Sequence, residues 1–297
     1  MGGQAPRRPR MAAVLLAGAL ALGGCGGATE SRTEPEGDPS LAAMVPADLR
    51  ERGRIVVATD ASYPPMEFKD SKGRLVGVDI DLGREIAAEL GLEAEFKNAR
   101  FDGIIGGVQA GKYDLAISDF AATKEREKAV DMVTYFSSGS AVAVKAGNPE
   151  KLDPDLLCGV RVAVQAGSIQ ADDIKDNRNP ACVRAGKAPI PGDGDRYDLQ
   201  TQVTEALLAG RVSAMIADTV VVDYAINQFK GRFERLGTPY DISPSAIVVP
   251  KGDGQLTQAV QGAVQNLIDD GTYGQVLEKW GVAANGIAKS VINGAPH

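Results

Sequence analysis

The sequence predicts an α/β protein with two lobes, in which each lobe is a mainly parallel sheet flanked by helices. A strand–helix alternation runs once along the chain, breaks off, and then begins again, which is typical of two α/β units. A chain of 297 residues is also longer than one small core usually serves. The last helical stretch has no sheet of its own to cover, so we expect it to return to the first lobe.

The first 25 residues resemble an export signal. Three arginines within residues 7–10 precede an apolar stretch at 11–22, which is short for a membrane span. The run Leu-Gly-Gly-Cys at residues 22–25 resembles a bacterial lipobox, in which cleavage leaves a lipid-modified cysteine, here Cys25, as the first residue. The alternative is a plain secretory signal with a chance cysteine.

Residues 26–45 are predicted to form a flexible tether. The segment is rich in Thr, Glu, Ser, Pro and Gly, and residues 28–40 include no large apolar side chain. Such a composition buries too little apolar surface to offset the entropy of ordering.

Two further cysteines, Cys158 and Cys182, would then lie in a compartment that permits disulfides. We expect them to be paired, since two thiols remain once Cys25 is lipidated. Two buried free thiols are the alternative.

The first lobe is assigned residues 46–138 and 244–297. Its expected elements, in order, are a strand at 54–59, a short apolar piece at 75–78, a helix through Leu82, Ile86 and Leu90 that stops at Gly91, a strand at 93–97, a helix through Ile104, Ile105 and Val108, a strand at 114–118, a strand at 246–249, a helix through Leu256, Val260, Val264 and Leu267, and a final helix at 273–280.

The second lobe is assigned residues 139–243. Its expected elements are a strand at 160–164, a polar stretch with the two cysteines, a helix through Val203, Ala206 and Leu207, and a strand at 212–216. The chain would cross between the lobes near 137–142 and near 237–243. Two connecting strands of this kind suit hinge closure around a ligand.

Charge and histidine content exclude several classes of function. A formal net charge of -7 argues against a nucleic-acid partner and against broad adhesion to anionic membranes. The single histidine, His297, is the last residue, so the folded body offers no Ser-His-Asp or Cys-His pair. A His-based metal centre is equally disfavoured, and we expect neither a metal nor a cofactor.

Polar residues follow several predicted strands, and ligands of open α/β sheets bind beyond such carboxyl ends. Taken singly, each has a plain alternative as a turn or a helix cap. The residues are Asp60 and Tyr63 after the first strand, Ser118 and Asp119 before Arg126, Ser168 in the second lobe, and Asp218 after a later strand.

These residue types together suit a zwitterion. The guanidinium of Arg126 can hold a carboxylate through two parallel hydrogen bonds, and a Gly-Ser turn at Ser168 can add backbone donors. Asp218 would accept hydrogen bonds from an ammonium group. Tyr63 and Phe101 would form apolar walls. The pattern therefore predicts a site for a free amino acid.

The sequence also resembles the polar amino-acid-binding proteins of ABC importers, the bacterial extracellular solute-binding proteins of family 3. The matching blocks span nearly all of residues 50–290. They are Val57 to Phe68 (VATDASYPPMEF), Leu75 to Leu82 (LVGVDIDL), Gly111 to Ile117 (GKYDLAI), Thr123 to Arg126 with Asp131, Gly167-Ser168, Ala209 to Arg211 with Asp218, Asp270 to Tyr273, and Lys279 to Gly281.

This resemblance implies a periplasmic-binding-protein fold of the second topological type, with two lobes and a two-strand hinge. By position, Arg126 matches the arginine that holds the α-carboxylate and Asp218 the aspartate that binds the α-ammonium. Tyr63 and Phe101 match the ligand-covering walls, and Asp60 matches a residue that meets the ligand side chain in some relatives. Ala121 and Ile169 stand where relatives often carry a hydroxyl residue, so only their backbone N–H groups can serve.

Asp119 departs from the family, because relatives often carry Ser or Gly there. A second acid near Asp60 favours a ligand with a cationic or amide side chain, since an acidic one would meet unpaired negative charge. The alternative is that Asp119 faces solvent or pairs with a basic residue of the second lobe.

The predicted function is capture of a free amino acid and its delivery to an ABC permease, by a monomer outside the cytoplasm that only a lipid anchors to the membrane. A first rival is an enzyme on the same scaffold, a cyclohexadienyl dehydratase or a lytic transglycosylase, with Asp60, Asp119 and Glu67 as candidate carboxylates. A second rival is a ligand-sensing receptor subunit.

Overall fold

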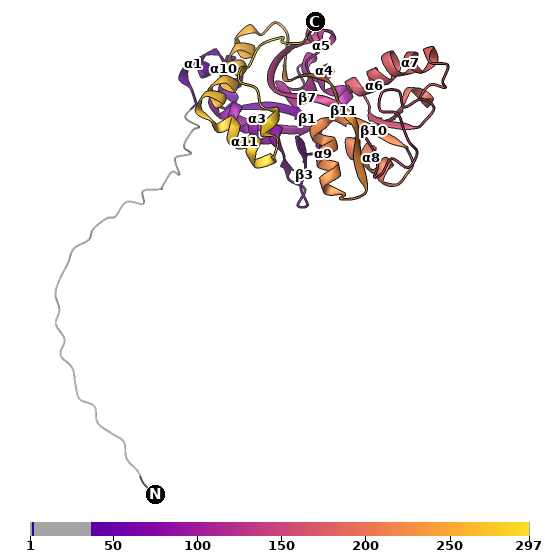
Figure 1. Ribbon diagram of the computed structural model, residues 1–297. Helices are drawn as coiled ribbons and strands as arrows, with labels where there is room; N and C mark the ends of the chain where they lie inside the picture. The colour runs from indigo at the N-terminus through magenta and orange to yellow at the C-terminus, as the bar shows by residue number, and fades with distance from the viewer. Residues whose placement is uncertain (1, 3–36, 297) are drawn as a thin grey trace, which may run out of the picture. The chain divides into compact units, whose positions relative to one another are not determined.

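The computed structural model describes residue 2 and residues 37–296 (Figure 1). The predicted signal sequence, the lipobox with Cys25 and the first part of the predicted tether lie outside these residues, apart from Gly2.

A single eight-stranded sheet runs through the folded body in the order β5-β1-β6-β11-β7-β10-β8-β9. Its two central strands, β7 (Asp131–Lys145) and β11 (Phe233–Val249), are long and pair antiparallel with each other. The other strands are β1 (Arg54–Thr59), β5 (Glu93–Asn98), β6 (Leu115–Ala121), β8 (Val162–Gln165), β9 (Asp195–Tyr197) and β10 (Ala214–Asp218).

The two ends of this sheet form two lobes. On one side β1 pairs parallel with β5 and β6, and on the other β8 pairs parallel with β10 and β9. Within this eight-stranded sheet, the antiparallel pairs all involve β7 or β11. Each half is thus a mainly parallel α/β unit, as predicted, and the two long strands belong to both halves.

Helices cover both halves of the sheet (Figure 1). In chain order they are α1 (Pro39–Met44), α2 (Ala47–Arg52), α3 (Val78–Glu89), α4 (Phe101–Gln109), α5 (Lys124–Ala129), α6 (Ile169–Asp173), the π-helical segment η1 (Ile174–Arg178), α7 (Asn179–Arg184), the short turn η2 (Pro191–Asp193), α8 (Gln200–Leu208), α9 (Thr219–Gln228), α10 (Gly254–Asp270), α11 (Thr272–Trp280) and the turn η3 (Ala283–Asn285). A small second sheet contains β2 (Ser62–Tyr63), β3 (Glu67–Lys69) and β4 (Leu75–Val76).

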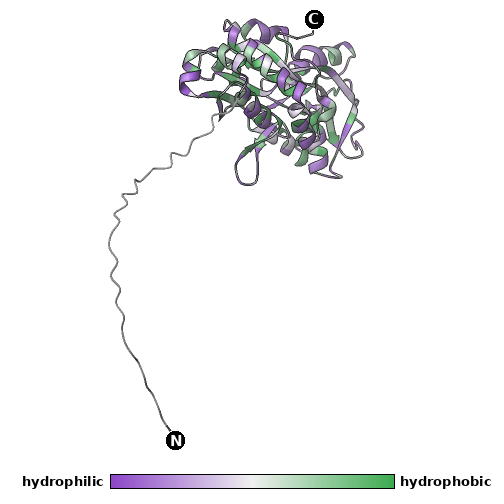
Figure 2. Cartoon of the chain, turned by 90° about the vertical axis from the view of Figure 1, so that its left-hand side faces the viewer, coloured by the Kyte–Doolittle hydropathy of each residue, from purple (hydrophilic) through white to green (hydrophobic). Residues whose placement is uncertain are grey.

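The sequence periodicities explain the main elements. Ile55 and Val57 of β1 are buried, as expected for a β-branched strand in a covered sheet. The i, i+4 stripe of α10 is buried at Leu256, Val260 and Val264. Gly271 ends that helix with a φ of 88°, a left-handed conformation that glycine adopts without steric cost. In Figure 2 hydrophobic segments lie mostly within the body, and hydrophilic segments colour much of its outer surface.

The C-terminal helices return to the first half of the chain. α10 packs against α1 and α3, and α11 packs against α3. The indole N–H of Trp280 donates to Asp81 on α3 at 2.8 Å, which fixes the end of α11 there. The last helices therefore cover the β1 half of the sheet.

Three expectations differ from the structure. The predicted tether extended to residue 45, but α1 lies within that range and its Leu41 is buried beside Gly262 of α10. Leu41 and Val45, both buried, dock this segment, and Met44 packs against the same core. The polar stretch between Gly167 and Leu199 contains α6, η1 and α7, and α9 directly after Asp218 was not foreseen. The Val-Val-Val run near the start of α9 has no 3.6-residue period, so the hydrophobic pattern did not predict this helix.

The predicted disulfide is present. Cys158 and Cys182 are bonded, with their Cα atoms 5.6 Å apart and a sequence separation of 24. The bridge ties α7 to the segment that follows β7.

Replacing both Cys158 and Cys182 by serine should lower the free energy of unfolding by about 3 kcal/mol, because the unfolded chain regains the entropy of an open loop. Urea unfolding of oxidised wild type and of the double variant measures this difference. Reduced wild type is the control and should match the variant. Equal midpoints for all three samples would contradict the prediction.

Candidate functional site

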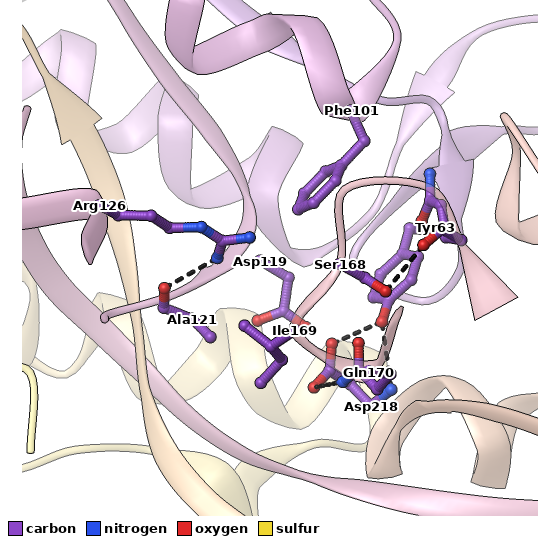
Figure 3. A pocket seen from close by; sticks show the side chains of 10 residues that line it. Tyr63, Phe101, Asp119, Ala121, Arg126, Ser168, Ile169, Gln170 and Asp218 are labelled. Atoms are coloured by element: carbon purple, nitrogen blue, oxygen red, sulfur yellow. Dashed lines mark hydrogen bonds between the residues drawn. The ribbon is translucent and has the colours of Figure 1, made fainter. Parts of the chain in front are cut away.

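A cavity lined by residues of both halves lies at the strand ends (Figure 3). In this closed arrangement the space that a water-sized sphere can enter is only about 10 Å³, so the side chains of the two halves nearly fill the cavity. The lining side chains come from both halves and are Tyr63, Phe101, Asp119, Ala121, Arg126, Gln165, Ser168, Ile169, Gln170 and Asp218.

Arg126 supplies the positive charge of this cavity. It lies on α5, whose first turn is capped by Thr123 Oγ1, which accepts the Arg126 N–H at 3.2 Å. Its guanidinium lies over the stacked rings of Phe101 and Phe120, 5.7 and 5.3 Å from their centroids. Burial lowers the pKa of Arg126 to about 10, so the group stays cationic at neutral pH.

The acceptors that Arg126 finds within the described residues are backbone carbonyls. Its Nη1 donates to Ala121 O at 2.9 Å, and its Nη2 reaches across the cavity to Gly167 O at 3.1 Å. Carbonyl groups carry only partial charge, so the positive charge remains available for a stronger, ionised acceptor.

Asp218 supplies a negative charge from the opposite half. It ends β10 and precedes the first residue of α9. Its Oδ2 accepts the Tyr63 hydroxyl at 2.5 Å, and its Oδ1 accepts Gln170 Nε2 at 3.3 Å. Burial raises the pKa of Asp218 to about 6, although the Tyr63 hydrogen bond and the attraction of Arg126 oppose this rise. At neutral pH the carboxyl is therefore ionised in the main.

Asp119 lies between Arg126 and Asp218 in Figure 3. Its side chain is only 4% exposed, and neither carboxyl oxygen has a hydrogen-bond partner within 3.5 Å among residues 37–296. Burial raises the pKa of Asp119 well above its usual range, and repulsion by Asp218 and Asp79 adds to the rise. The Ser245 side chain on β11 is close enough to oppose the rise of the Asp119 pKa in part. Thus Asp119 neither faces solvent nor pairs with a basic residue of the second lobe.

The turn at the start of α6 faces the cavity from the second half. Ser168 caps the helix, since its Oγ accepts the Ala171 N–H at 3.2 Å and donates to Gln165 O at 2.8 Å. The N–H groups of the first helical turn have no partner within the helix. Ile169 and Gln170 of this turn line the cavity, together with Arg126 and Asp218.

Eight of the ten residues that the sequence predicted for the site line this one cavity; they are Tyr63, Phe101, Asp119, Ala121, Arg126, Ser168, Ile169 and Asp218. The other two lie behind it. Asp60 accepts hydrogen bonds from Phe101 N at 3.0 Å and Gln165 Nε2 at 3.1 Å. Ser118 accepts from Asp60 N at 3.0 Å and donates to Glu67. Both therefore support the residues in front of them and are absent from the lining.

Two lining residues, Gln165 and Gln170, were not foreseen. Gln165 is the last residue of β8, so the rule that ligands bind beyond strand ends could have found it. Gln170 had no such signal, because it follows the Gly-Ser turn by two residues within a polar stretch.

The described residues offer no group of three or more His, Cys, Asp or Glu side chains arranged to hold a metal ion. Among residues 37–296, likewise, no helix is both long and apolar enough to cross a bilayer.

Comparisons with known proteins agree with this geometry. Residues 55–283 match the bacterial extracellular solute-binding proteins, family 3. An arginine-binding protein, ArgT, of Corynebacterium glutamicum is 34% identical over 263 residues, which cover 88% of this chain and 85% of the relative. An ancestral arginine-binding protein, solved with arginine and also with glutamine, is 36% identical with a TM-score of 0.70. The arginine complex covers 77% of this chain and 98% of its own.

The chain belongs to the bacterial extracellular solute-binding proteins of family 3. Its fold is the predicted two-lobed periplasmic-binding-protein fold of the second type, and it is a solute-binding protein. Another solved neighbour is an ancestral amino-acid-binding protein described as a precursor of cyclohexadienyl dehydratase, 31% identical over 78% of this chain and 97% of its own, with a TM-score of 0.70. The scaffold is therefore related to one from which an enzyme arose.

Asp119→Asn should make the fold less sensitive to alkaline pH. In the wild type the unfolded carboxyl ionises near its usual value of 3.8, whereas the folded one holds its proton to higher pH. The free energy of unfolding therefore falls as pH rises from about 4 through the folded pKa. Urea unfolding at about pH 4 and pH 8 should show a smaller loss for Asp119→Asn than for wild type. An identical loss would contradict the assigned burial.

Proposed function

We propose that this protein captures a free amino acid with a cationic side chain, arginine above all, and delivers it to an ABC permease. The observation that carries the proposal is the shared cavity, in which Arg126 from one half and Asp218 from the other stand together with the unpaired carboxyl of Asp119. Each of these three groups has a counterpart in one part of such a ligand.

The α-carboxylate belongs beside Arg126. A guanidinium can hold a carboxylate with two parallel charged hydrogen bonds, which are stronger than its present bonds to carbonyls. The first turn of α6, at Ile169 and Gln170, would add uncharged N–H donors from the opposite half. Ala121 brings no hydroxyl, so its contribution is limited to its backbone.

The α-ammonium belongs beside Asp218. This carboxylate already holds the Tyr63 hydroxyl and the Gln170 amide, which fix its orientation. Because Tyr63 and Asp218 lie in opposite halves, an ammonium bound here would favour the closed arrangement of the two halves.

The ligand side chain belongs beside Asp119. An acidic side chain is disfavoured there, because its carboxylate and that of Asp119 could not both stay ionised in a desolvated site. A cation would instead supply the partner that both Asp119 oxygens lack. ArgT and the ancestral protein solved with arginine are both arginine-binding proteins, and the similarity of this chain to them supports arginine among the cationic amino acids.

An enzymatic function is the second candidate, since the scaffold is related to a dehydratase precursor. An acid or base would need to aim at a scissile bond. Arg126, Asp218 and Asp119 instead correspond to the three charged groups of a complete cationic amino acid, so we propose binding without turnover. Mass spectrometry of the ligand after incubation with the protein separates the two: unchanged arginine supports binding, and a product supports catalysis.

In a thermal-shift panel of the common amino acids, arginine should raise the melting temperature in proportion to the logarithm of its concentration. Arg126→Ala should weaken arginine binding by about 3 kcal/mol, roughly 100-fold in Kd, because the ligand carboxylate loses its ionised partner. Lys128→Ala, which removes an exposed cation from the same helix, is the matched control. Arginine affinity that is equal in both variants would refute the assignment.

We also propose that Cys25 carries the lipid anchor, that the folded body is monomeric, and that it acts on the outer face of the cell membrane. The support is the sequence Leu-Gly-Gly-Cys at residues 22–25 and the extracellular character of the family. In cells fed a labelled fatty acid, wild type should carry the label and stay with the membrane fraction, whereas Cys25→Ser should lose both properties. Label retained on the serine variant would exclude this anchor.

A further inference from the structure

Three carboxyl groups are buried together at the cavity: Asp119 on β6 lines it, and Glu67 on β3 and Asp79 on α3 lie behind the lining. Their exposed fractions are 4%, 1% and 0%. None of the ion pairs formed by the described residues involves any of the three. Carboxyl groups so placed cannot all be ionised, because burial and mutual repulsion both oppose it.

Hydrogen bonds distinguish the three groups. Asp79 accepts from the Tyr135 hydroxyl at 2.6 Å and from the Asp119 N–H at 2.9 Å, so each oxygen has a donor. Within the part of the chain that the structure describes, Glu67 accepts one hydrogen bond, from Ser118, and its other oxygen has no partner. Neither oxygen of Asp119 has a partner in that part of the chain. The donors therefore favour the charged form of Asp79 and leave Glu67 and Asp119 as the groups that hold protons.

The pKa values follow the same order. Burial raises the pKa of Asp79 to about 6, while its hydrogen bonds from Tyr135 and Asp119 oppose the rise. Burial raises the pKa values of Glu67 and Asp119 further, well above their usual range, and the charge of Asp79 adds to both.

Asp119 is the member of this cluster that a ligand can touch. It lines the cavity, whereas Glu67 and Asp79 do not. Its backbone has a φ of 43°, a left-handed conformation that is unfavourable for most residues other than glycine. The Asp79 carboxylate holds the Asp119 N–H in this position. A strained backbone that points an unpaired acid into a binding cavity is the geometry of a functional residue.

We propose that Asp119 carries a proton in the unliganded protein and that a cationic ligand side chain displaces it, so that capture of a cationic amino acid releases one proton. The O–H bond of the Asp119 carboxyl breaks, its electron pair stays on the carboxylate oxygen, and the proton passes to the buffer. This inference rests on the proposed amino-acid site. It adds a mechanism by which that site distinguishes amino acids with cationic side chains from those with amide side chains.

An amide ligand has no such requirement. The neutral Asp119 carboxyl can donate a hydrogen bond to an amide oxygen, so glutamine can bind without displacing the proton. Arginine affinity should therefore rise with pH, by up to about tenfold per pH unit below the pKa of unliganded Asp119, and then level off. Glutamine affinity should lack this contribution.

Other groups near Asp119 also titrate or carry charge, and the comparison of two ligands is designed to cancel them. Asp218, with its pKa near 6, meets the α-ammonium of arginine and of glutamine alike. Arg126 meets the α-carboxylate of both. The groups that face Asp119 from the neighbouring elements are Tyr63 on β2, Glu67 on β3, Asp79 on α3, Arg126 on α5, Tyr135 on β7 and Asp218 on β10.

The test is isothermal titration calorimetry of the purified protein with arginine, lysine, ornithine and glutamine, from about pH 5 to about pH 9. At a pH where arginine affinity still rises, each titration is repeated in phosphate and in Tris, whose ionisation enthalpies differ. The tightest cationic ligand should show a buffer-dependent heat equal to about one released proton. Glutamine should show no heat from the Asp119 proton. Any proton transfer at groups that both ligands contact, such as Asp218, should appear equally with glutamine and with the cation.

Asp119→Asn is the informative variant. It should abolish the extra proton release and make the ratio of cation to glutamine affinity independent of pH. Asp223→Asn removes an exposed carboxyl of α9 outside the cavity lining and should behave as wild type. Should Asp119→Asn fail to fold, the two-buffer titration of the wild type still decides.

The outcomes separate this inference from the proposed function. If a cation binds with no proton release and with the same pH dependence as glutamine, the proton displacement is wrong and the cationic site stands. If glutamine binds and no cation does, both the displacement and the cation preference are wrong, although an amino-acid site remains. If none of the amino acids binds, the proposed function fails and the inference fails with it.

Discussion

The structure depends on two opposite charges that stand in one cavity although they come from separate halves of the sheet. Arg126 follows β6 on one side of the long strands β7 and β11, and Asp218 ends β10 on the other. Because both long strands belong to both halves, they hold the two groups in register and still leave the strand ends around the cavity to face each other. A ligand that carries both a carboxylate and an ammonium group can therefore bridge the two halves. Neither half alone offers a partner for both groups.

Contacts between the halves already close this cavity. Tyr63 binds Asp218, Arg126 binds the Gly167 carbonyl, Gln165 binds Asp60, and the Gln200 N–H donates to Ser62 Oγ at 3.0 Å. Most of them join uncharged groups to charged ones, so they orient the charges without neutralising them. A polar site that is held in place before binding loses less conformational freedom when the ligand arrives.

Several carboxyl groups near the cavity are buried, which is unfavourable for the stability of the fold. Asp60, Glu67, Asp79 and Asp119 are all nearly inaccessible, and burial raises the pKa of each. A fold selected for stability alone would replace such groups by apolar ones of similar volume. Their presence beside a cavity indicates that the site is built to meet positive charge, and Asp119 is where that charge can reach the cluster.

Much of this protein could be predicted from local sequence, because strands, helices and glycine stops depend on near neighbours. The periodicities located β1, α3 and α10, and the strand-end rule brought Asp119 and Asp218 into consideration.

Tertiary structure decided which of these polar groups share a cavity. Tyr63 and Asp218 are 155 residues apart in the chain, and their hydrogen bond depends on how β7 and β11 join the two halves. The same long-range packing moved Asp60 and Ser118 behind the lining, brought Gln165 and Gln170 into it, and docked α1 on α10, since each outcome depends on partners that no local pattern specifies.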